Sequence, residues 1–395
     1  MSRPSSSTSS SSGSGRPDAA PSSRRAAVRE AAQVALWFVV ALVVADIVLG
    51  LAFAFPQDGD GRGASALANY LDYGRSIEGK IRRMVGPTDA QTAAMARAGW
   101  LGDHDDLPAH PAHAGPLVAV YGMSFAARVA DELVALDPSV TIRMVGGPGA
   151  PLNHSYAAWE RDRDAHDAAV VVLGVLASSL PRTLSLTHMT ANFEAPSPHS
   201  YPRFDWKQGR IERTEPRIAT LPQLRAALAG ATAADRQAWE AWKRQLAGHD
   251  AFYDRFVFEA NASDHSVIVR LIRRAWGQHV FQATVAATHD AEGFRDDLGV
   301  VRSARALLRD FAQRVRARGR LPIVLLFEDR GYADHLSRAL APTLDAADVR
   351  YVATGRIAPA TQLGNFLADG HFRPEIDQRI AQQVLETIRE ELPAD

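Results

Sequence analysis

The chain has 395 residues, and its 44 Lys and Arg nearly balance its 45 Asp and Glu, which leaves a formal net charge of −1 at pH 7. A balance this close gives no overall field that would favour nucleic acid as a partner. The sequence contains no cysteine, which excludes disulfides, thiolate metal sites and cysteine nucleophiles. The length suffices for one large domain or two small ones after the N-terminal region.

The N-terminal region divides into a polar tail and an apolar segment. Residues 1–30 are rich in Ser, Gly, Pro and Arg, and such a composition buries too little surface to offset the entropy of ordering. We therefore expect a disordered cytoplasmic tail over 1–30. From Ala31 to Phe55 the sequence is apolar except for Gln33 and Asp46. This segment of about 25 residues is long enough to cross a hydrocarbon core of about 30 Å, which predicts one transmembrane helix over 31–55.

The flanking charges predict how this helix is oriented. Arginines precede the span and acids follow it, namely Arg24, Arg25 and Arg29 before and Asp58 and Asp60 after. The positive-inside rule then puts the N-terminus in the cytoplasm. We expect a single-pass inner-membrane protein with its main domain periplasmic or extracellular. A cleaved signal peptide is the competing interpretation, because Ala52-Phe-Ala54 offers a small-residue site, but the apolar region exceeds the roughly 7 to 15 residues usual in signal peptides.

Residues 56–114 are predicted to form a linker or neck with short helices. Their last part contains three Asp and three His, from Asp103 to His113, and these residue types can bind a divalent metal. Pro108, Pro111 and the absence of a helical or strand period favour a solvated loop. We therefore predict no metal site and no cofactor, with a metal-dependent hydrolase using this stretch as an alternative.

After Gly115, short β-branched runs alternate with helical segments. The predicted strands are 117–121, 140–145, 169–176, 321–327 and 350–353, and the predicted helices are 126–136, 302–318, 332–344 and 375–391. Alternation of this kind predicts an α/β fold, in which helices cover both faces of a parallel sheet. The active sites of such folds lie at the carboxyl ends of the strands.

Residues 181–300 interrupt this alternation with a Pro- and aromatic-rich stretch followed by helical segments. We predict an insertion that packs beside the active-site edge of the sheet. One interpretation is a substrate-binding lid. Most of its aromatic residues, among them Trp239 and Trp242, recur at helical spacing, which is more typical of a core than of a sugar-binding platform.

Two short motifs contain the residue types of a serine nucleophile and its base. The apolar run from Leu117 breaks at Gly122 and presents Ser124 just before a helical segment, and Asp369 and His371 precede the final helical segment. A serine hydroxyl needs a base, and a histidine oriented by a carboxylate supplies one. We predict Ser124 as nucleophile, His371 as base and Asp369 as the orienting acid of a hydrolase or acyltransferase.

A glycine-rich segment follows the second predicted strand. It reads Gly146-Gly-Pro-Gly149, and glycines at this position let backbone N–H groups approach a tetrahedral oxyanion. We predict an oxyanion hole formed by the N–H groups of Ser124 and Gly149. A plain turn at the strand exit is the alternative.

These motifs resemble the SGNH/GDSL hydrolase family. Gly122-Met-Ser124 resembles its first block, Gly146–Gly149 its glycine block, and Asp369-Gly-His371 its last block. The resemblance covers about residues 115–392, with the insertion outside it. It implies a flavodoxin-like, three-layer α/β/α domain with a parallel sheet and no cofactor.

The chain departs from the family pattern at two places. Met123 stands where the family commonly has Asp, and the third block, where Gly-x-Asn-Asp would follow the third strand, has no asparagine. One expected oxyanion donor is therefore missing. Ser178, Ser179 and Asn153 are the candidates to replace it.

The Asp-x-His spacing resembles membrane-associated relatives that transfer acetyl groups on bacterial exopolysaccharides. This resemblance implies an acyl-Ser124 intermediate, an acyl ester or acylated cell-envelope glycan as substrate, and exopolysaccharide machinery as a partner. A hypothesis from a different class is a non-catalytic envelope scaffold or glycan-binding protein, because losing one oxyanion donor costs roughly 10² to 10³ in rate.

Overall fold

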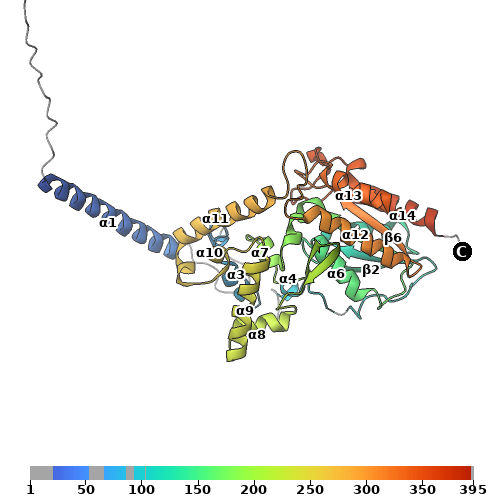
Figure 1. Ribbon diagram of the computed structural model, residues 1–395, viewed down its shortest axis with the longest axis horizontal. Helices are drawn as coiled ribbons and strands as arrows, with labels where there is room; N and C mark the ends of the chain where they lie inside the picture. Colours follow the sequence, from blue (N-terminus) through green and yellow to red (C-terminus); the bar gives the residue numbers. More distant parts are fainter. Residues whose placement is uncertain (1–20, 53–65, 86–92, 103, 393–395) are drawn as a thin grey trace, which may run out of the picture. The chain divides into compact units, whose positions relative to one another are not determined.

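A computed structural model describes residues 21–52, 66–85, 93–102 and 104–392. The chain divides into two compact units, Met1–Ala54 and Phe55–Asp395. The first unit contains a single helix, α1 (Pro21–Ala52). The second contains a sheet domain and a group of helices beside it (Figure 1).

Helix α1 is long and apolar enough between Arg25 and Ala52 to cross a membrane, and its side chains there are exposed. The expectation of a disordered tail up to residue 30 was wrong for residues 21–30, which form the first turns of α1. Alanines and arginines in these turns favour helix, so the apolar helix extends toward its N-terminus. Residues 1–20 of the predicted tail and residues 53–55 of the predicted span lie outside the described part of the chain.

A five-stranded sheet forms the centre of the second unit, with the strand order β2-β1-β3-β6-β7. Its strands are β1 (Leu117–Gly122), β2 (Thr141–Gly146), β3 (Val170–Leu176), β6 (Leu321–Phe327) and β7 (Arg350–Ala353). Each neighbouring pair is parallel. The side chains of β1 and β3 are buried on both faces, as in sheets that helices cover on both sides. The predicted α/β fold with a parallel sheet is confirmed.

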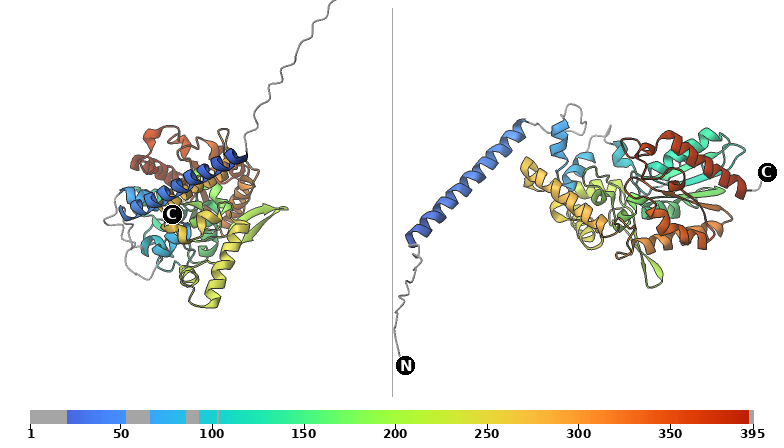
Figure 2. Two further views of the ribbon diagram at one scale, coloured as in Figure 1. Left: turned by 90° about the vertical axis from the view of Figure 1, so that its left-hand side faces the viewer. Right: turned by 90° about the horizontal axis from the view of Figure 1, so that it is seen from above.

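Two separate hydrophobic clusters show which helices cover each face. Alternate residues of β1 belong to different clusters. Val118 and Val120 belong to the first cluster, and Ala119 and Tyr121 belong to the second. The first cluster includes α5 (Ser124–Leu136) and α14 (Pro374–Glu391), which pack against each other. The second includes α6 (Leu152–Asp162), α12 (Val300–Arg316) and α13 (His335–Ala346). The sheet thus lies between two helical layers (Figure 2).

A helical lobe lies beside the sheet domain and is formed by both the neck and the insertion. It contains α2 (Ala66–Asp72), α3 (Ile77–Met84), α4 (Ala93–Arg97), α7 (His188–Ala191), α8 (Leu221–Ala229), α9 (Ala233–His249), α10 (Arg255–Phe258) and α11 (Val267–Ala286). A third cluster joins Ile77 and Ile81 of the neck to Leu224, Trp242 and Phe258 of the insertion. The neck is therefore part of a core rather than a linker.

The insertion also contains elements that the sequence did not predict. An antiparallel hairpin, β4 (Arg203–Lys207) and β5 (Arg210–Thr214), precedes α8. Short 3-10 turns occur within the insertion at Pro181–Leu184 (η2) and Ala262–His265 (η3), and outside it at Ala177–Ser179 (η1), Thr354–Arg356 (η4) and Leu363–Asn365 (η5). Trp239 and Trp242 are buried in the third cluster, which confirms the core interpretation for them, whereas Trp276 is 45 % exposed.

The His-rich end of the neck is held against the sheet domain by a buried arginine. Arg143 of β2 is 1 % exposed and pairs with Asp162 at 2.6 Å. It also donates to the backbone carbonyls of His104, Leu107 and Pro108. Within the described ranges no group of three His, Asp or Glu is arranged to hold a metal ion, and Asp103 lies outside them. Most side chains from Asp105 to His113 are nevertheless exposed, which agrees with the solvated loop that the sequence predicts, and Arg143 holds only its backbone.

Candidate active site

Ser124 stands at the junction between β1 and α5. The strand ends at Gly122, and Met123 is the extended N-cap residue of the helix, with φ −116° and ψ −171°. A Cβ at Gly122 would lie 2.6 Å from the Cβ of Ala126, so the tight turn requires glycine there. The Met123 side chain is buried while Ser124 is exposed. The turn therefore directs the serine toward solvent at the carboxyl edge of the sheet.

The base predicted for this serine lies next to it. The Oγ atom of Ser124 is 2.7 Å from Nε2 of His371, although 247 positions separate the two residues in the chain. The ring of Phe125 lies 4.9 Å from the ring of His371 and 5.3 Å from that of Phe372. These contacts fix the loop before α14 on the start of α5. The structure thus brings together the two residues that the sequence predicted as nucleophile and base.

Asp369 faces the other nitrogen of the imidazole. Its Oδ2 atom is 3.1 Å from Nδ1 of His371, and its Oδ1 atom accepts the backbone N–H of His371 at 3.1 Å. The Nδ1 contact is an ion-pair contact and not a well-aligned hydrogen bond. The backbone N–H of His371, followed by its ring, lowers the pKa of Asp369 below the usual range. The carboxylate is therefore ionised at neutral pH beside the ring that it would orient.

Arg128 is a charged neighbour that the sequence analysis missed. It lies one helical turn after Ser124 on α5, so i to i+4 spacing could have indicated it. Its Nη2 atom is 3.8 Å from Oδ2 of Asp369, and its Nη1 atom is 4.0 Å from Oδ2 of Asp377. Burial raises the pKa of Asp377 to about 7 despite the arginine. Arg128 thus connects the Asp369 loop to the first turn of α14.

The glycine segment lies beside the end of β1. Gly122 pairs with Gly146 in the sheet, and the N–H of Gly147 donates to the carbonyl of Gly122 at 3.3 Å. Gly149 has φ +57°, a left-handed conformation that favours glycine. A Cβ at Gly149 would also lie 3.0 Å from both Nη1 of Arg182 and Nε2 of His188. Both backbone and surroundings therefore require glycine at the predicted oxyanion donor.

The candidates for the missing asparagine make other contacts. Asn153 is fully buried and donates to the carbonyl of Pro202 at 2.9 Å. The hydroxyl of Ser179 donates to the carbonyl of Leu176 at 3.0 Å, and the N–H of Ser178 donates to Oδ1 of Asp329 at 3.0 Å. A group that is buried and already bonded does not meet a substrate. Asn153 and Ser179 therefore do not replace the asparagine, and the N–H of Ser178 is committed to Asp329.

Arg182 is a second residue that sequence reasoning did not select. It lies in η2, after β3, and its Nε atom is enclosed without a hydrogen-bond partner among the described residues. Burial lowers the pKa of its guanidinium, and the carboxylate of Asp329 opposes this shift. Its approach to Gly149 connects the segments after β3 and β2. Since β1 lies between these two strands, the contact of Arg182 with Gly149 lies at the same edge of the sheet as Ser124, which follows β1.

Two buried histidines, His154 and His188, lie beside the glycine segment, and a third, His199, packs on both. The rings of His188 and His199 stack at 5.2 Å, and those of His154 and His199 lie 5.3 Å apart. Burial lowers the pKa of His154 to about 4 and that of His188 to about 3. These rings are therefore neutral at physiological pH, and they form a packed support for the glycine segment.

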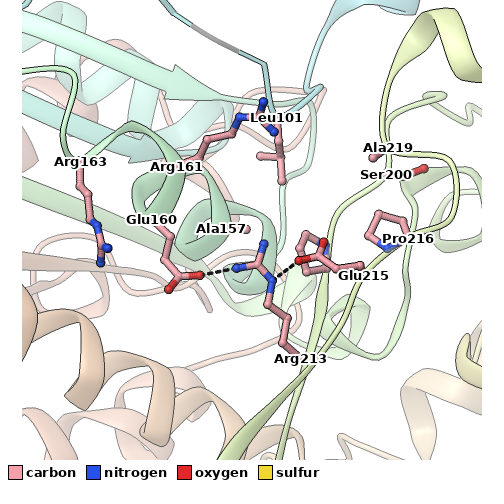
Figure 3. A pocket seen from close by; sticks show the side chains of 11 residues that line it. Leu101, Ala157, Glu160, Arg161, Arg163, Ser200, Arg213, Glu215, Pro216 and Ala219 are labelled. Carbon is pink, nitrogen blue, oxygen red and sulfur yellow. Dashed lines mark hydrogen bonds and ion pairs between the residues drawn. The ribbon is translucent and has the colours of Figure 1, made fainter.

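A pocket of about 350 Å³ lies away from Ser124. Figure 3 shows Arg213 in this pocket between Glu160 and Glu215, with ion-pair distances of 2.8 and 2.5 Å. The residues that α6 contributes to it lie in the second half of that helix, toward the end of the sheet opposite the carboxyl ends of the strands. Because these charges pair with one another, we assign the pocket no role in the chemistry.

Comparisons with known proteins identify no family. No protein-family model matches the chain, and no curated protein matches it.

Proposed function

We propose that this protein is a serine esterase or O-acyltransferase of the SGNH type. The observation that carries the proposal is the 2.7 Å approach of Ser124 Oγ to Nε2 of His371, with Asp369 3.1 Å from Nδ1 of the same ring. The nucleophile thus contacts the base, and the base contacts the orienting acid, as acyl transfer through a serine requires. The parallel sheet, the serine after its first strand, the glycines after the second and the Asp-x-His before the last helix all support the SGNH resemblance.

The proposed reaction proceeds through an acyl-enzyme. His371 accepts the proton of Ser124 as Oγ attacks the acyl carbon of an ester, and the resulting tetrahedral oxyanion collapses as His371 returns the proton to the departing alkoxide. This leaves the acyl group on Ser124 and releases an alcohol. Water or a sugar hydroxyl then attacks the acyl-serine, with its proton taken by His371 and returned to Ser124 Oγ. When water is the acceptor, the product is a carboxylic acid. When a sugar hydroxyl is the acceptor, the product is a new ester.

Arg182 would supply the oxyanion donor that the family usually takes from asparagine. The N–H groups of Ser124 and Gly149 provide two donors in this proposal, and the Arg182 guanidinium approaches Gly149. A guanidinium is charged at all working pH values, so it stabilises negative charge that develops on the substrate oxygen. One such donor contributes roughly 10² to 10³ in rate, which would offset the missing asparagine.

The membrane helix supports a substrate in the cell envelope. With α1 spanning the inner membrane and Arg25 and Arg29 at its cytoplasmic end, the sheet domain would lie in the periplasm or outside the cell. The substrate would then be an acyl ester or an acylated envelope polysaccharide, and the partner would be exopolysaccharide machinery. The rival function, a non-catalytic scaffold or glycan-binding protein, is favoured by the absence of the third-block asparagine.

A covalent label separates the two functions. Purified full-length protein would be treated with a fluorophosphonate, which reacts with activated serines, and the modified residue would be identified by mass spectrometry. We expect modification at Ser124, its loss in Ser124→Ala, and no change in Ser139→Ala, a serine in the turn that follows α5. An unlabelled wild-type protein that also fails to hydrolyse a small acetyl ester would overturn the enzyme and favour the scaffold.

A further inference from the structure

Helix α11 exposes three large apolar residues and buries two of its three arginines. Leu271, Ile272 and Trp276 are 37, 56 and 45 % exposed, whereas Arg270 and Arg273 are 2 and 0 % exposed. A surface helix ordinarily has the opposite arrangement, with its apolar stripe toward the core. The outer face of α11 is therefore suited to a surrounding that is less polar than water.

The buried arginines hold α11 in this orientation. Arg273 pairs with Asp264 and donates to the backbone carbonyl of Phe256 at 2.8 Å. Arg270 donates to the carbonyl of Asp264 at 2.6 Å, and its Nη1 atom is 3.4 Å from Oδ1 of Asp72. Turning the helix to bury Ile272 would break these contacts and leave buried charges unpaired, which is costly. The exposure of the apolar side is thus fixed by the fold.

The neighbouring helices extend the apolar surface. Helix α2 packs on α11, and the guanidinium of Arg274 lies 4.0 Å from the ring centre of Tyr70. Leu67 and Tyr70 of α2 are 47 and 48 % exposed, and Tyr73, which follows α2, is 42 % exposed. We call Leu67, Tyr70, Tyr73, Leu271, Ile272 and Trp276 together the α2–α11 face. Neighbouring exposed apolar and aromatic residues of this kind are typical of an interaction surface.

The length of the preceding tether indicates what covers this face. Helix α1 ends at Ala52 and α2 begins at Ala66, so 13 residues (66 − 52 − 1) separate the two helices. Even fully extended, a segment of this length spans at most about 45 Å. If α1 crosses a membrane, the start of α2 therefore stays within about that reach of the bilayer, and α11 packs on α2. Tyr and Trp, with an apolar body and a polar tip, are enriched where lipid meets water.

We propose that the α2–α11 face rests on the outer surface of the same membrane, with Ile272 and Trp276 among the lipid headgroups. This placement depends on α1 spanning the membrane and is independent of the chemistry at Ser124. Helix α11 contains no acidic residue, so it carries no charge that anionic lipids would repel. The α2–α11 face acts as an interfacial anchor that holds the helical lobe against the bilayer.

The natural absence of cysteine allows a direct test. Ile272→Cys, labelled with a nitroxide, would be reconstituted as the full-length protein in vesicles of phosphatidylethanolamine and phosphatidylglycerol. Collisions of the label with oxygen, which concentrates in lipid, would be compared with collisions with a water-soluble nickel chelate. We expect a nickel-to-oxygen collision ratio several-fold lower at position 272 than for Glu386→Cys, an exposed position on α14.

Two further variants keep the outcomes distinct. A label on Val43→Cys, within α1, should be the most protected from nickel if α1 spans the bilayer. The label at position 43 could be protected by lipid while the labels at 272 and 386 are equally accessible to nickel. This result would overturn the proposed membrane contact of the α2–α11 face and would still agree with α1 as a membrane-spanning helix. A label at 272 shielded from both reagents, with dipolar broadening between labels, would mean that a second copy covers the face and would also overturn it. Turnover of a small soluble ester in the same vesicles reports on Ser124 separately.

Discussion

Arg128 Nη2 lies 3.8 Å from Oδ2 of Asp369, the carboxylate that faces the ring of His371. The same arginine approaches the buried Asp377 and donates to the carbonyl of Phe372 at 3.4 Å. Both Arg128 and Asp369 are partly exposed, so solvent weakens their attraction. The arginine nevertheless bridges the two sides of the His371 loop, which makes it a positioning residue in the proposed mechanism.

Ser124→Ala and His371→Ala should each abolish esterase activity, because each removes one half of the 2.7 Å contact. The double variant should be scarcely slower than either single one, since members of one catalytic unit are strongly non-additive. Initial rates on a small acetyl ester, with thermal unfolding to confirm the fold, check this. Wild-type turnover in Ser124→Ala would exclude the serine mechanism, and Ser139→Ala serves as the matched control.

Asp369→Asn should reduce kcat by less than the roughly 10⁴-fold known for a buried, well-aligned carboxylate. The reason is that Asp369 is 57 % exposed and its contact with Nδ1 is poorly aligned. Steady-state kinetics on the same ester provide the measurement. A loss as large as that of His371→Ala would mean that the carboxylate closes on the ring when substrate binds.

Arg182→Met should lower kcat roughly 10²- to 10³-fold with little change in KM, as expected for a donor that acts on the oxyanion. Arg182→Lys should recover part of that loss, because it keeps the charge and loses the planar fork. Arg309→Met, at an exposed position on α12, is the control. If KM rises and kcat is unchanged, Arg182 binds the ground state and the oxyanion role is wrong.

Lowering the pH from 7 to 5 should destabilise the fold. Burial lowers the pKa of His154 and His166 to about 4 and that of His188 to about 3, below the value of about 6.5 in an unfolded chain. Between the pKa of a histidine in the folded protein and its pKa in the unfolded chain, the unfolded chain binds more protons than the folded one. The contribution of these histidines to the free energy of unfolding is therefore fully present above about pH 6.5 and is lost as the pH falls. Asp250, with a pKa raised to about 6, and Asp377, with one raised to about 7, oppose this trend, as do Asp310, Glu328 and Asp329, whose pKa values burial also raises. We expect the histidines to outweigh these acids between pH 7 and pH 5.

Thermal unfolding at pH 7 and pH 5 tests the histidine effect. His199→Phe should reduce the loss of Tm between these pH values, because both ring nitrogens of His199 are buried without a hydrogen-bond partner in the described part of the chain. The exposed His113→Phe should leave the loss unchanged. An equal loss in the wild type and His199→Phe would show that His199 does not contribute to it.

A reporter fused after Asp395 should be active only outside the cytoplasm if α1 is held by the positive charges that precede it. Replacing Arg24, Arg25 and Arg29 with Glu should weaken or scramble that orientation. Alkaline phosphatase, which requires an oxidising compartment, and a cytoplasmic fluorescent reporter give complementary readings. An inactive phosphatase fusion together with a fluorescent cytoplasmic fusion would reverse the predicted topology.

The sheet could be predicted because its signals are local. The apolar runs at 117–121 and 321–327 correspond to β1 and β6 within one residue, since strands covered on both faces have few polar positions. The pairing of Ser124 with His371 could be predicted because parallel strands end at one edge of the sheet. The start of α1 at Pro21 was missed because composition alone does not show how far a helix extends.

The remaining features depend on contacts between distant parts of the chain. Ile81 of the neck packs with Trp242 of the insertion, and no local period reveals such a partner. Arg182 follows a strand like many surface arginines, and only its approach to Gly149 distinguishes it. The burial of Arg273 likewise depends on Asp264 and on the backbone of α10. From the sequence alone, a charged residue is expected to be exposed to solvent, because the partner that would be buried with it is not known.

The 247 positions between Ser124 and His371 affect when the nucleophile can form. Helix α14 packs on α5, and His371 immediately precedes it. A chain still being synthesised would already contain Ser124 and α5 but would lack the imidazole that activates the serine. Under the proposed mechanism, the serine therefore stays inert until His371 has been made and α14 has docked on α5.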